Sequence, residues 1–205
     1  MTTTNPRPRS LTHTPLAGGG TPPAHAERGA GELAISPISV ADAGEVLTIQ
    51  RAAFVSEAII YGSVDMPPLV QTLDELEAEL DGSEGWVARL DGRLVGAIRT
   101  RESDGLLLIG RIAIAPDMQG SGIGRALLEA AEQHSRAAEA ELFTGSLSEA
   151  NIRLYEHCGY VETVRVDKGG GVEEVYLRKR LRTDGAGRAP SGGTAGTPRR
   201  AGATG

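Results

Sequence analysis

The feature that most constrains the fold of this chain is the stretch GRIAIAPDMQGSGIGRALLEAAE, residues 110–132. Residues 111–115 have the β-branched alternation of a strand, and Pro116 ends that strand because proline has no N–H for a ladder. A glycine-rich turn, residues 119–124, then leads into a helix with apolar residues at helical spacing. Such a turn leaves backbone N–H groups unpaired at the positive end of the helix, so it predicts an anion site suited to phosphate. Arg125 adds a cation that can bind phosphate bidentately.

Three known phosphate-binding patterns compete for this turn. A P-loop requires Gly-Lys-Ser/Thr, where the chain has Gly124-Arg125-Ala126. The dinucleotide pattern Gly-x-Gly-x-x-Gly fails because Gly124 comes one residue early. The third pattern, Gln/Arg-x-x-Gly-x-Gly/Ala, is filled at every fixed position by residues 119–124. It is the pyrophosphate loop of the GNAT acetyltransferase superfamily, which the chain resembles here. The alternative is a strand–helix connection that uses glycine only to turn tightly.

Composition predicts a domain flanked by two tails. Residues 1–31 are rich in Thr, Pro, Gly and Arg, and residues 182–205 contain seven glycines and no aliphatic side chain larger than alanine. Neither segment can bury enough apolar surface to offset the entropy of ordering, so both are predicted to be disordered. The N-terminal segment lacks the apolar core of a secretory signal; it weakly resembles a transit peptide, and a plain disordered extension is favoured. Residues 32–181 are the predicted domain.

Charge and cysteine content exclude some classes of function. Residues 32–181 hold 25 acidic and 14 basic residues, a net charge of −11, so the domain is a poor nucleic-acid surface. This charge would attract a cationic small molecule or a basic peptide, although acidic surfaces most often serve solubility. Cys158 is the sole cysteine of the chain, which suits a reducing cytoplasm. No apolar stretch is long enough for a membrane span, and no histidine has a second ligand at metal spacing.

The order of elements predicts an α/β fold with a mixed sheet of the α+β kind. Helices are predicted after Ser39 or Asp42, after Thr72, which forms a capping box with Glu75, and after Ser148. The predicted strands are residues 33–38, 86–90, 94–99, 106–115, 140–144, 161–166 and 172–181. Turn residues predict an antiparallel meander of the second to fourth strands, and residues 140–144 should return parallel to the fourth. The last two strands should form a hairpin.

A second motif strengthens the resemblance to the GNAT superfamily. Residues 151–160, NIRLYEHCGY, match the family pattern Asn-x-x-x-Tyr-x-x-x-Gly-Phe/Tyr at the expected distance after the glycine turn. The resemblance covers residues 32–181 and implies acetyl-CoA as the acetyl donor, with the strands before and after the central helix splayed apart around its pantetheine arm. The cofactor-binding residues that it implies are Ile112, Ala113, Ile114, Gln119, Gly120, Ser121, Gly122, Ile123, Gly124, Arg125, Asn151 and Tyr155.

The resemblance also implies an acid but leaves the base open. A tyrosine hydroxyl beside the thioester sulfur can protonate the departing thiolate, and Tyr155 stands at that place in the motif. Relatives often carry a glutamate on the strand before the glycine turn, where this chain has Arg111 as the one ionisable residue. Glu57 is the first candidate for the base because Tyr61 follows it by one helical turn; the others are Asp65, Glu102 and Tyr61. Arg111 can instead bind an acceptor carboxylate or pair with a neighbouring acid.

These observations favour a cytoplasmic, acetyl-CoA-dependent N-acetyltransferase that acts on a primary amine of a small molecule or a peptide. It is expected to be a monomer or a homodimer without nucleic-acid, membrane or metal partners. Because the strand before the glycine turn lacks a carboxylate, a non-catalytic acyl-CoA-binding sensor is the alternative. A dinucleotide-binding oxidoreductase has only the spacing of the glycines in its favour.

Overall fold

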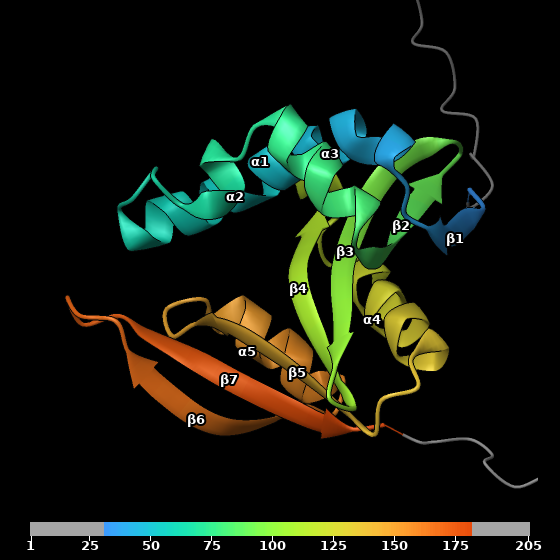
Figure 1. Ribbon diagram of the computed structural model, residues 1–205. Helices are drawn as coiled ribbons and strands as arrows, with labels where there is room; N and C mark the ends of the chain where they lie inside the picture. The colour runs from blue at the N-terminus through green and yellow to red at the C-terminus, as the bar shows by residue number, and fades with distance from the viewer. Residues whose placement is uncertain (1–30, 182–205) are drawn as a thin grey trace, which may run out of the picture. The chain divides into compact units, whose positions relative to one another are not determined.

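The computed structural model describes residues 31–181, which form one seven-stranded mixed sheet with helices on both faces (Figure 1). The segments predicted as disordered tails lie outside the described residues, apart from Gly31. The strands are β1 (Leu33–Pro37), β2 (Glu84–Leu90), β3 (Arg93–Ser103), β4 (Leu106–Ile114), β5 (Glu139–Gly145), β6 (Val161–Asp167) and β7 (Glu173–Arg180). The helices are α1 (Ala43–Tyr61), α2 (Pro67–Val70), α3 (Leu73–Asp81), α4 (Ile123–His134) and α5 (Glu149–His157). This arrangement confirms the predicted α/β fold class.

The meander of β2, β3 and β4 is built by two tight turns that the sequence predicts. Asp91 and Gly92 connect β2 to β3, and Asp104 and Gly105 connect β3 to β4. All four residues have positive φ, from 50° at Asp91 to 83° at Gly92, which is the backbone of a hairpin turn matched to strand twist. The pairings of β2 with β3 and of β3 with β4 are antiparallel, as predicted.

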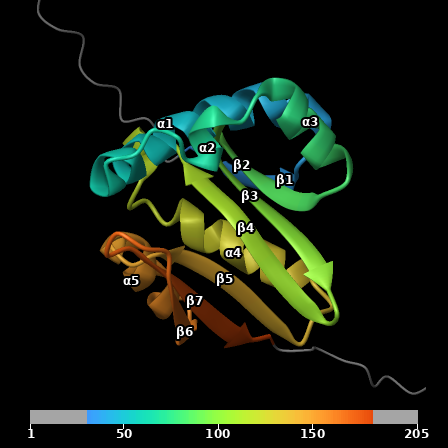
Figure 2. The same cartoon turned by 60° about the vertical axis from the view of Figure 1, so that its left-hand side comes forward.

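The sheet opens between its two central strands. β4 and β5 are parallel and pair only at their beginnings, where residues 106–108 lie beside residues 139–141. Beyond these pairs the strands diverge, as both ribbon views show (Figures 1 and 2). On the far side of β5 the order is β5-β7-β6, so the closing hairpin joins the sheet through its second strand. The predicted splay of the strands around the central helix is therefore present.

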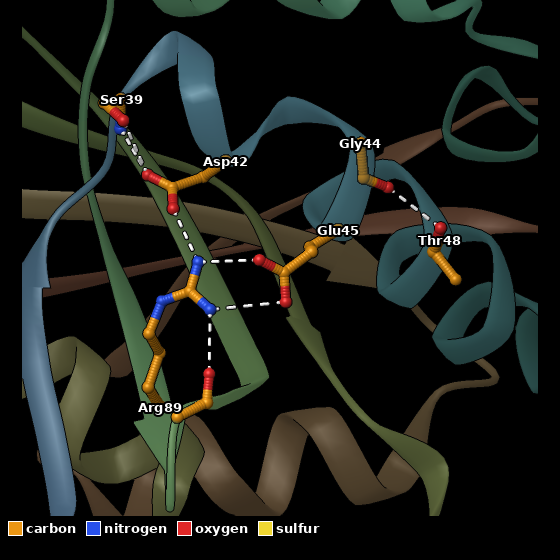
Figure 3. A network of polar contacts seen from close by, with 7 residues as sticks. Ser39, Asp42, Gly44, Glu45, Thr48 and Arg89 are labelled. Carbon is orange, nitrogen blue, oxygen red and sulfur yellow. Dashed lines mark hydrogen bonds and ion pairs between the residues drawn. The ribbon is translucent and has the colours of Figure 1, made fainter.

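Helices cover the two faces of the meander. α1 packs against β3 and β4, while α4 packs against β2, β3 and β4 from the other face. The start of α1 is tied to the sheet by Arg89 of β2, which binds Asp42 at 2.7 Å and Glu45 at 2.8 Å (Figure 3). The buried core lies between these layers and includes Ile98, which is fully buried, and Leu127 of α4.

Two details of the helices concern their ends. α1 continues to Tyr61 and ends at Gly62 in the left-handed conformation, so Glu57 lies within the helix. In α3 the predicted capping box of Thr72 and Glu75 is present, and Leu73 is 40% exposed. Leu73 is the first residue of that helix, where the chain still runs along the surface.

Candidate active site

The edge of β4 that faces the splay has unpaired backbone groups. The Ala115 N–H donates to the Val95 carbonyl of β3 at 2.9 Å. An antiparallel ladder alternates the direction of its hydrogen-bonding groups, so Ala113 also turns its N–H and C=O toward β3. Ile112 and Ile114 therefore turn theirs away from β3, toward an edge that β5 no longer covers. Ile112 and Ile114 therefore have backbone groups available to an extended ligand such as the pantetheine arm. Ala113 is buried, and its backbone groups pair with β3.

The middle of β4 contains a bulge. Ile98 is paired with Ile112 and Thr100 with Ile109, so that Arg99 lies opposite two residues, Gly110 and Arg111. A bulge of this kind bends a strand and increases its twist. It lies where β4 leaves β5, and it directs the Arg111 side chain toward the end of α2, where Arg111 Nη1 donates to Gln71 Oε1 at 2.5 Å.

The glycine turn supplies free donors at the start of α4. Gly120 and Gly122 have φ of 77° and 87°, values that residues with a Cβ rarely adopt, and Gly122 is the N-cap of the helix. The first helical hydrogen bond runs from the Ala126 N–H to the Gly122 carbonyl, and the preceding N–H groups, of residues 122–125, have no backbone acceptor within residues 31–181. Arg125 is exposed and binds Glu129 at 2.7 Å, a pair within one helix that a bound anion can replace at small cost.

The two sequence motifs lie side by side. A Cβ built on Gly124 would lie 3.4 Å from Cδ2 of Leu154, so α5 packs against the first turn of α4 at the glycine turn. Asn151 and Tyr155 are one helical turn apart on α5 and therefore share a face. That face meets the end of α1, because Asn151 Nδ2 donates to Glu57 Oε1 at 3.2 Å.

Glu57 is the centre of a polar network that joins α1 to the β5–α5 connection. Its other carboxylate oxygen accepts a very short hydrogen bond from the Ser148 hydroxyl. Ser148 Oγ also lies 3.0 Å from the Tyr61 hydroxyl, which accepts a hydrogen bond from the Leu147 N–H at 3.0 Å. Tyr61 lies so close to Gly145 that a Cβ there would be 2.1 Å from the tyrosine oxygen. Glycine at the end of β5 is therefore required for this contact.

Ser148 does not have the role that its position in the sequence predicts. It is the N-cap residue of α5, but its side chain makes no capping hydrogen bond. It is 3% exposed, and its hydroxyl is engaged by Glu57 and Tyr61 instead. Sequence reasoning missed this role because the partners are 91 and 87 residues away, and a serine before a helix is adequately explained as a cap.

Tyr155 is buried within this site. It is 8% exposed, and within the described domain no hydrogen-bond partner of its hydroxyl is found. Burial, and then the charge of Glu57, raise the pKa of Tyr155 well above the usual value of a phenol. The hydroxyl therefore keeps its proton at neutral pH.

The other residues considered for the base are arranged less favourably. Glu102 accepts hydrogen bonds from the Ser135 hydroxyl at 2.5 Å and from the Arg136 N–H at 2.8 Å, which hold its pKa below the usual range. These partners follow the last residue of α4, at the end of that helix away from the glycine turn. Asp65 is exposed in the connection between α1 and α2. Tyr61 is committed to Ser148 and Leu147, so Glu57 is the candidate that the structure brings next to Asn151 and Tyr155.

Other reactive side chains and hollows lie apart from this site. Burial raises the pKa of the Cys158 thiol, so it stays protonated at neutral pH. Within residues 31–181 no group of three or more potential metal ligands is found, and no helix is long and apolar enough to cross a membrane. A surface hollow of about 600 Å³ lies at the paired ends of β4 and β5, lined by residues such as Leu106 and Arg178. It is at the opposite end of these strands from the splay.

Comparisons with known proteins agree with this geometry. Residues 81–162 match the acetyltransferase (GNAT) domain family, a range that includes the glycine turn and the Asn151–Tyr155 motif. The structure of PaiA N-acetyltransferase from Thermoplasma acidophilum in complex with coenzyme A aligns with a TM-score of 0.61 at 17% identity, over 73% of this chain and 99% of that chain. The structure of yncA from Salmonella typhimurium with acetyl-CoA aligns with a TM-score of 0.59 at 19% identity, over 78% and 98%.

One curated relative matches in sequence. The UPF0157 protein YqkA of Bacillus subtilis (strain 168) is 32% identical over 130 residues, which are 62% of this chain and 37% of that protein. The chain thus spans little more than a third of the length of the curated relative that it matches. The family match covers residues 81–162, and the solved structures show that the chain has the fold of these acetyltransferases.

Proposed function

We propose that this protein transfers an acetyl group from acetyl-CoA to the primary amine of a small molecule or a peptide. The observation that carries the proposal is the continuity of three features. The unpaired edge of β4 leads directly into the glycine turn, and α5 packs against that turn with Asn151 and Tyr155 on one face. The coenzyme A and acetyl-CoA present in the PaiA and yncA structures support the same ligand here.

The residues present fit acetyl-CoA. Ile112 and Ile114 would pair with the amides of the pantetheine arm as an added strand does, and the arm would also meet Asn151. The free N–H groups from Gly122 to Arg125 would hold the pyrophosphate at the positive end of α4. Gln119, Gly120 and Ser121 complete the turn, and the Arg125 side chain would exchange Glu129 for a phosphate.

The side chains around α5 would divide the proton transfers between them. When bound, acetyl-CoA supplies its acetyl group as a thioester that an amine can take up with release of a free thiol. Glu57 is placed to accept the proton that the amine gives up, and Tyr155, protonated at neutral pH, is placed to donate one to the sulfur. An N–H group of the β4 edge can stabilise negative charge on a carbonyl oxygen. One proton is thus taken and one given for each transfer.

A thiol-release assay on the full chain tests the proposed function. Acetyl-CoA would be offered with separate pools of amino acids, polyamines and short peptides, and free thiol would be measured over time. The proposal expects release that depends on one amine pool and stops when that amine is acetylated. Tight acetyl-CoA binding with no release from any pool would instead identify a non-catalytic sensor. A cytoplasmic location and a monomeric or homodimeric state stay predictions from the sequence.

A further inference from the structure

A cluster of arginines lies on the face of the sheet covered by α1 and α2. Its members are Arg51, Arg99 and Arg111, joined through Gln50, Gln71 and Glu79, and we call it the arginine cluster. The Gln71 side-chain oxygen accepts from Arg111 at 2.5 Å and from Gln50 at 3.1 Å, and the Gln71 backbone oxygen accepts from Arg51 at 2.8 Å. Gln50 in turn accepts from Arg99 at 2.7 Å. Three positive charges thus converge around two neutral amides.

Among residues 31–181, one carboxylate compensates these charges, and it is already engaged. Glu79 Oε2 lies 2.9 Å from Nη1 of Arg99 and accepts from Gln71 Nε2 at 2.8 Å. Within the described part of the chain, Arg111 itself donates only to the neutral Gln71. Burial lowers the pKa of Arg111 more than the charge of Glu79 raises it, although the guanidinium stays charged at neutral pH. Its charge is therefore poorly compensated.

Arg111 is exceptional among the arginines that the structure describes. Eight of them have a carboxylate oxygen within 4.0 Å: Arg89, Arg93, Arg99, Arg125, Arg153, Arg165, Arg178 and Arg180. Arg51, Arg101 and Arg136 have none, but all three are exposed to water. Arg111 is the one partly buried arginine between residues 31 and 181 that has none. Its Nε and Nη2 atoms form no hydrogen bond with these residues. The Nε–Nη2 side of the guanidinium, which can bind a carboxylate bidentately, is therefore free.

The position of Arg111 relates it to the proposed acetyl-transfer site. The side chain of Ile114 faces α4, since a Cβ on Gly96 would touch both Ile114 and Leu127, whereas Arg111 reaches the opposite face, beside Gln71. Figure 2 shows the end of β4 beneath α1 and α2. On α1, Gln50 contacts the arginine cluster and Glu57 contacts Asn151. Seven residues separate them, two helical turns or about 10 Å along one face of the helix.

We propose that Arg111 binds a carboxylate of the acetyl acceptor, so that the acceptor is an amino carboxylic acid. The inference rests on the proposed function, since it assigns the substrate class of the same site. The carboxylate would occupy the free side of the Arg111 guanidinium, and the amine would lie toward Glu57 and Tyr155 at the other end of the same helix face. The arginine cluster is then a local positive site in a domain of net charge −11, which otherwise repels anions.

Matched acceptors test this assignment in the full-length protein. Glycine, β-alanine, 4-aminobutanoate and 6-aminohexanoate would be compared with their amides, which keep the amine and lose the negative charge. The wild type should show kcat/KM at least about 10-fold higher for the best acid than for its amide. Arg111→Gln should remove that preference through KM and leave the amide unchanged. The control Arg180→Gln removes the same charge from a side chain that is 93% exposed, and it should keep the preference. Equal rates for acid and amide in the wild type would overturn the inference.

A second variant separates a specific effect at Arg111 from misfolding. A binding measurement separates the outcome of this inference from that of the proposed function. Gln71→Glu places a permanent carboxylate beside Arg111 and should remove the acid preference while Arg111 is retained. Calorimetric titration with butanoate and hexanoate, which have no amine, should show binding to the wild type and at least about 10-fold weaker binding to both variants. Turnover of amines with no carboxylate binding would overturn this inference and leave the function standing. Carboxylate binding without turnover of any amine would support Arg111 and overturn the proposed function.

Discussion

Glu57 on α1 accepts a hydrogen bond from Nδ2 of Asn151 on α5 at 3.2 Å, although 94 residues separate the two in the chain. The contact joins two parts of the protein on opposite sides of the splayed strands. It brings a carboxylate next to the face of α5 that also bears Tyr155, whose pKa rises partly because of the Glu57 charge. The site proposed for acetyl transfer therefore contains a carboxylate and a tyrosine hydroxyl, although β4 has no carboxylate.

The first prediction concerns Tyr155. Replacing it with phenylalanine keeps the buried ring and removes the proton donor, so kcat should fall by about 100-fold while the dissociation constant for acetyl-CoA stays unchanged. Steady-state kinetics and calorimetric titration of the same preparation would separate the two effects. Unchanged kcat from pH 6 to pH 9 would remove Tyr155 from the mechanism.

The second prediction concerns Glu57. Glutamine at this position can still accept from Asn151 through its one amide oxygen and can donate from its amide N–H to Ser148 Oγ. The fold should therefore be kept while kcat/KM falls by about 100-fold for lack of a proton acceptor. The matched control is Glu149→Gln, because Glu149 is a glutamate of α5 with a side chain 78% exposed. If both variants lose activity equally, the effect belongs to the surface charge of the domain and not to Glu57.

The third prediction separates backbone strain from ligand binding at the glycine turn. Gly122→Ala and Gly105→Ala both place a Cβ at positive φ, 87° and 76°, with no neighbouring atom within 4 Å. Each should lower the free energy of unfolding by about 1–2 kcal/mol. Only Gly122→Ala should also weaken acetyl-CoA binding, because Gly105 lies in the β3–β4 hairpin. Denaturant unfolding and calorimetry measure the two quantities, and equal affinities for acetyl-CoA would show that the turn does not bind pyrophosphate.

The fourth prediction is a loss of stability at alkaline pH. Burial raises the pKa of Tyr155 and of Tyr160, and the charge of Glu132 raises that of Tyr160 further. Both tyrosines ionise near pH 10 in the unfolded chain but keep their protons in the folded one. Their contribution is complete below pH 10 and is lost as the pH rises further, by up to about 1.4 kcal/mol per pH unit for each group.

Denaturant unfolding between pH 8 and pH 11 tests this loss. Tyr160→Phe should be less stable at pH 8, because Tyr160 donates to Glu132 at 2.8 Å, but its stability should fall less steeply above pH 10. Parallel pH profiles for the variant and the wild type would contradict the prediction.

Local sequence patterns predicted most of the fold. Asp91-Gly92 and Asp104-Gly105 predicted both hairpins because two-residue turns require the positive φ that these residues tolerate. The glycine turn and the Asn151–Tyr155 motif were also predicted from local patterns. The glycine turn lies within one strand–turn–helix unit, and the motif begins within one helix. The splay of β4 from β5 came from the resemblance and is present in the structure.

Long-range side-chain contacts were beyond what local patterns can predict. The Ser148–Glu57 contact joins residues 91 positions apart, and Ser148 reads locally as a helix cap. Gln50, Gln71 and Arg99 read as ordinary polar residues of a helix, a turn and a strand, yet they are 1%, 9% and 4% exposed. The one local signal was Arg99 at the end of the apolar run Leu94–Ile98, because arginine in a buried strand needs a partner. Its partners come from α1 and α3 and only folding identifies them.

Acetyl-CoA binding to the 205-residue chain tests most directly whether the β4 edge and the glycine turn hold this ligand. Thermal unfolding would be followed with acetyl-CoA and, in parallel, with NAD. At about 100 times its dissociation constant a ligand stabilises the fold by roughly 2.7 kcal/mol, which raises Tm by several degrees. Acetyl-CoA should raise Tm in this way, NAD should not, and Gly122→Ala should reduce the shift. No shift with acetyl-CoA, or an equal shift with NAD, would contradict it.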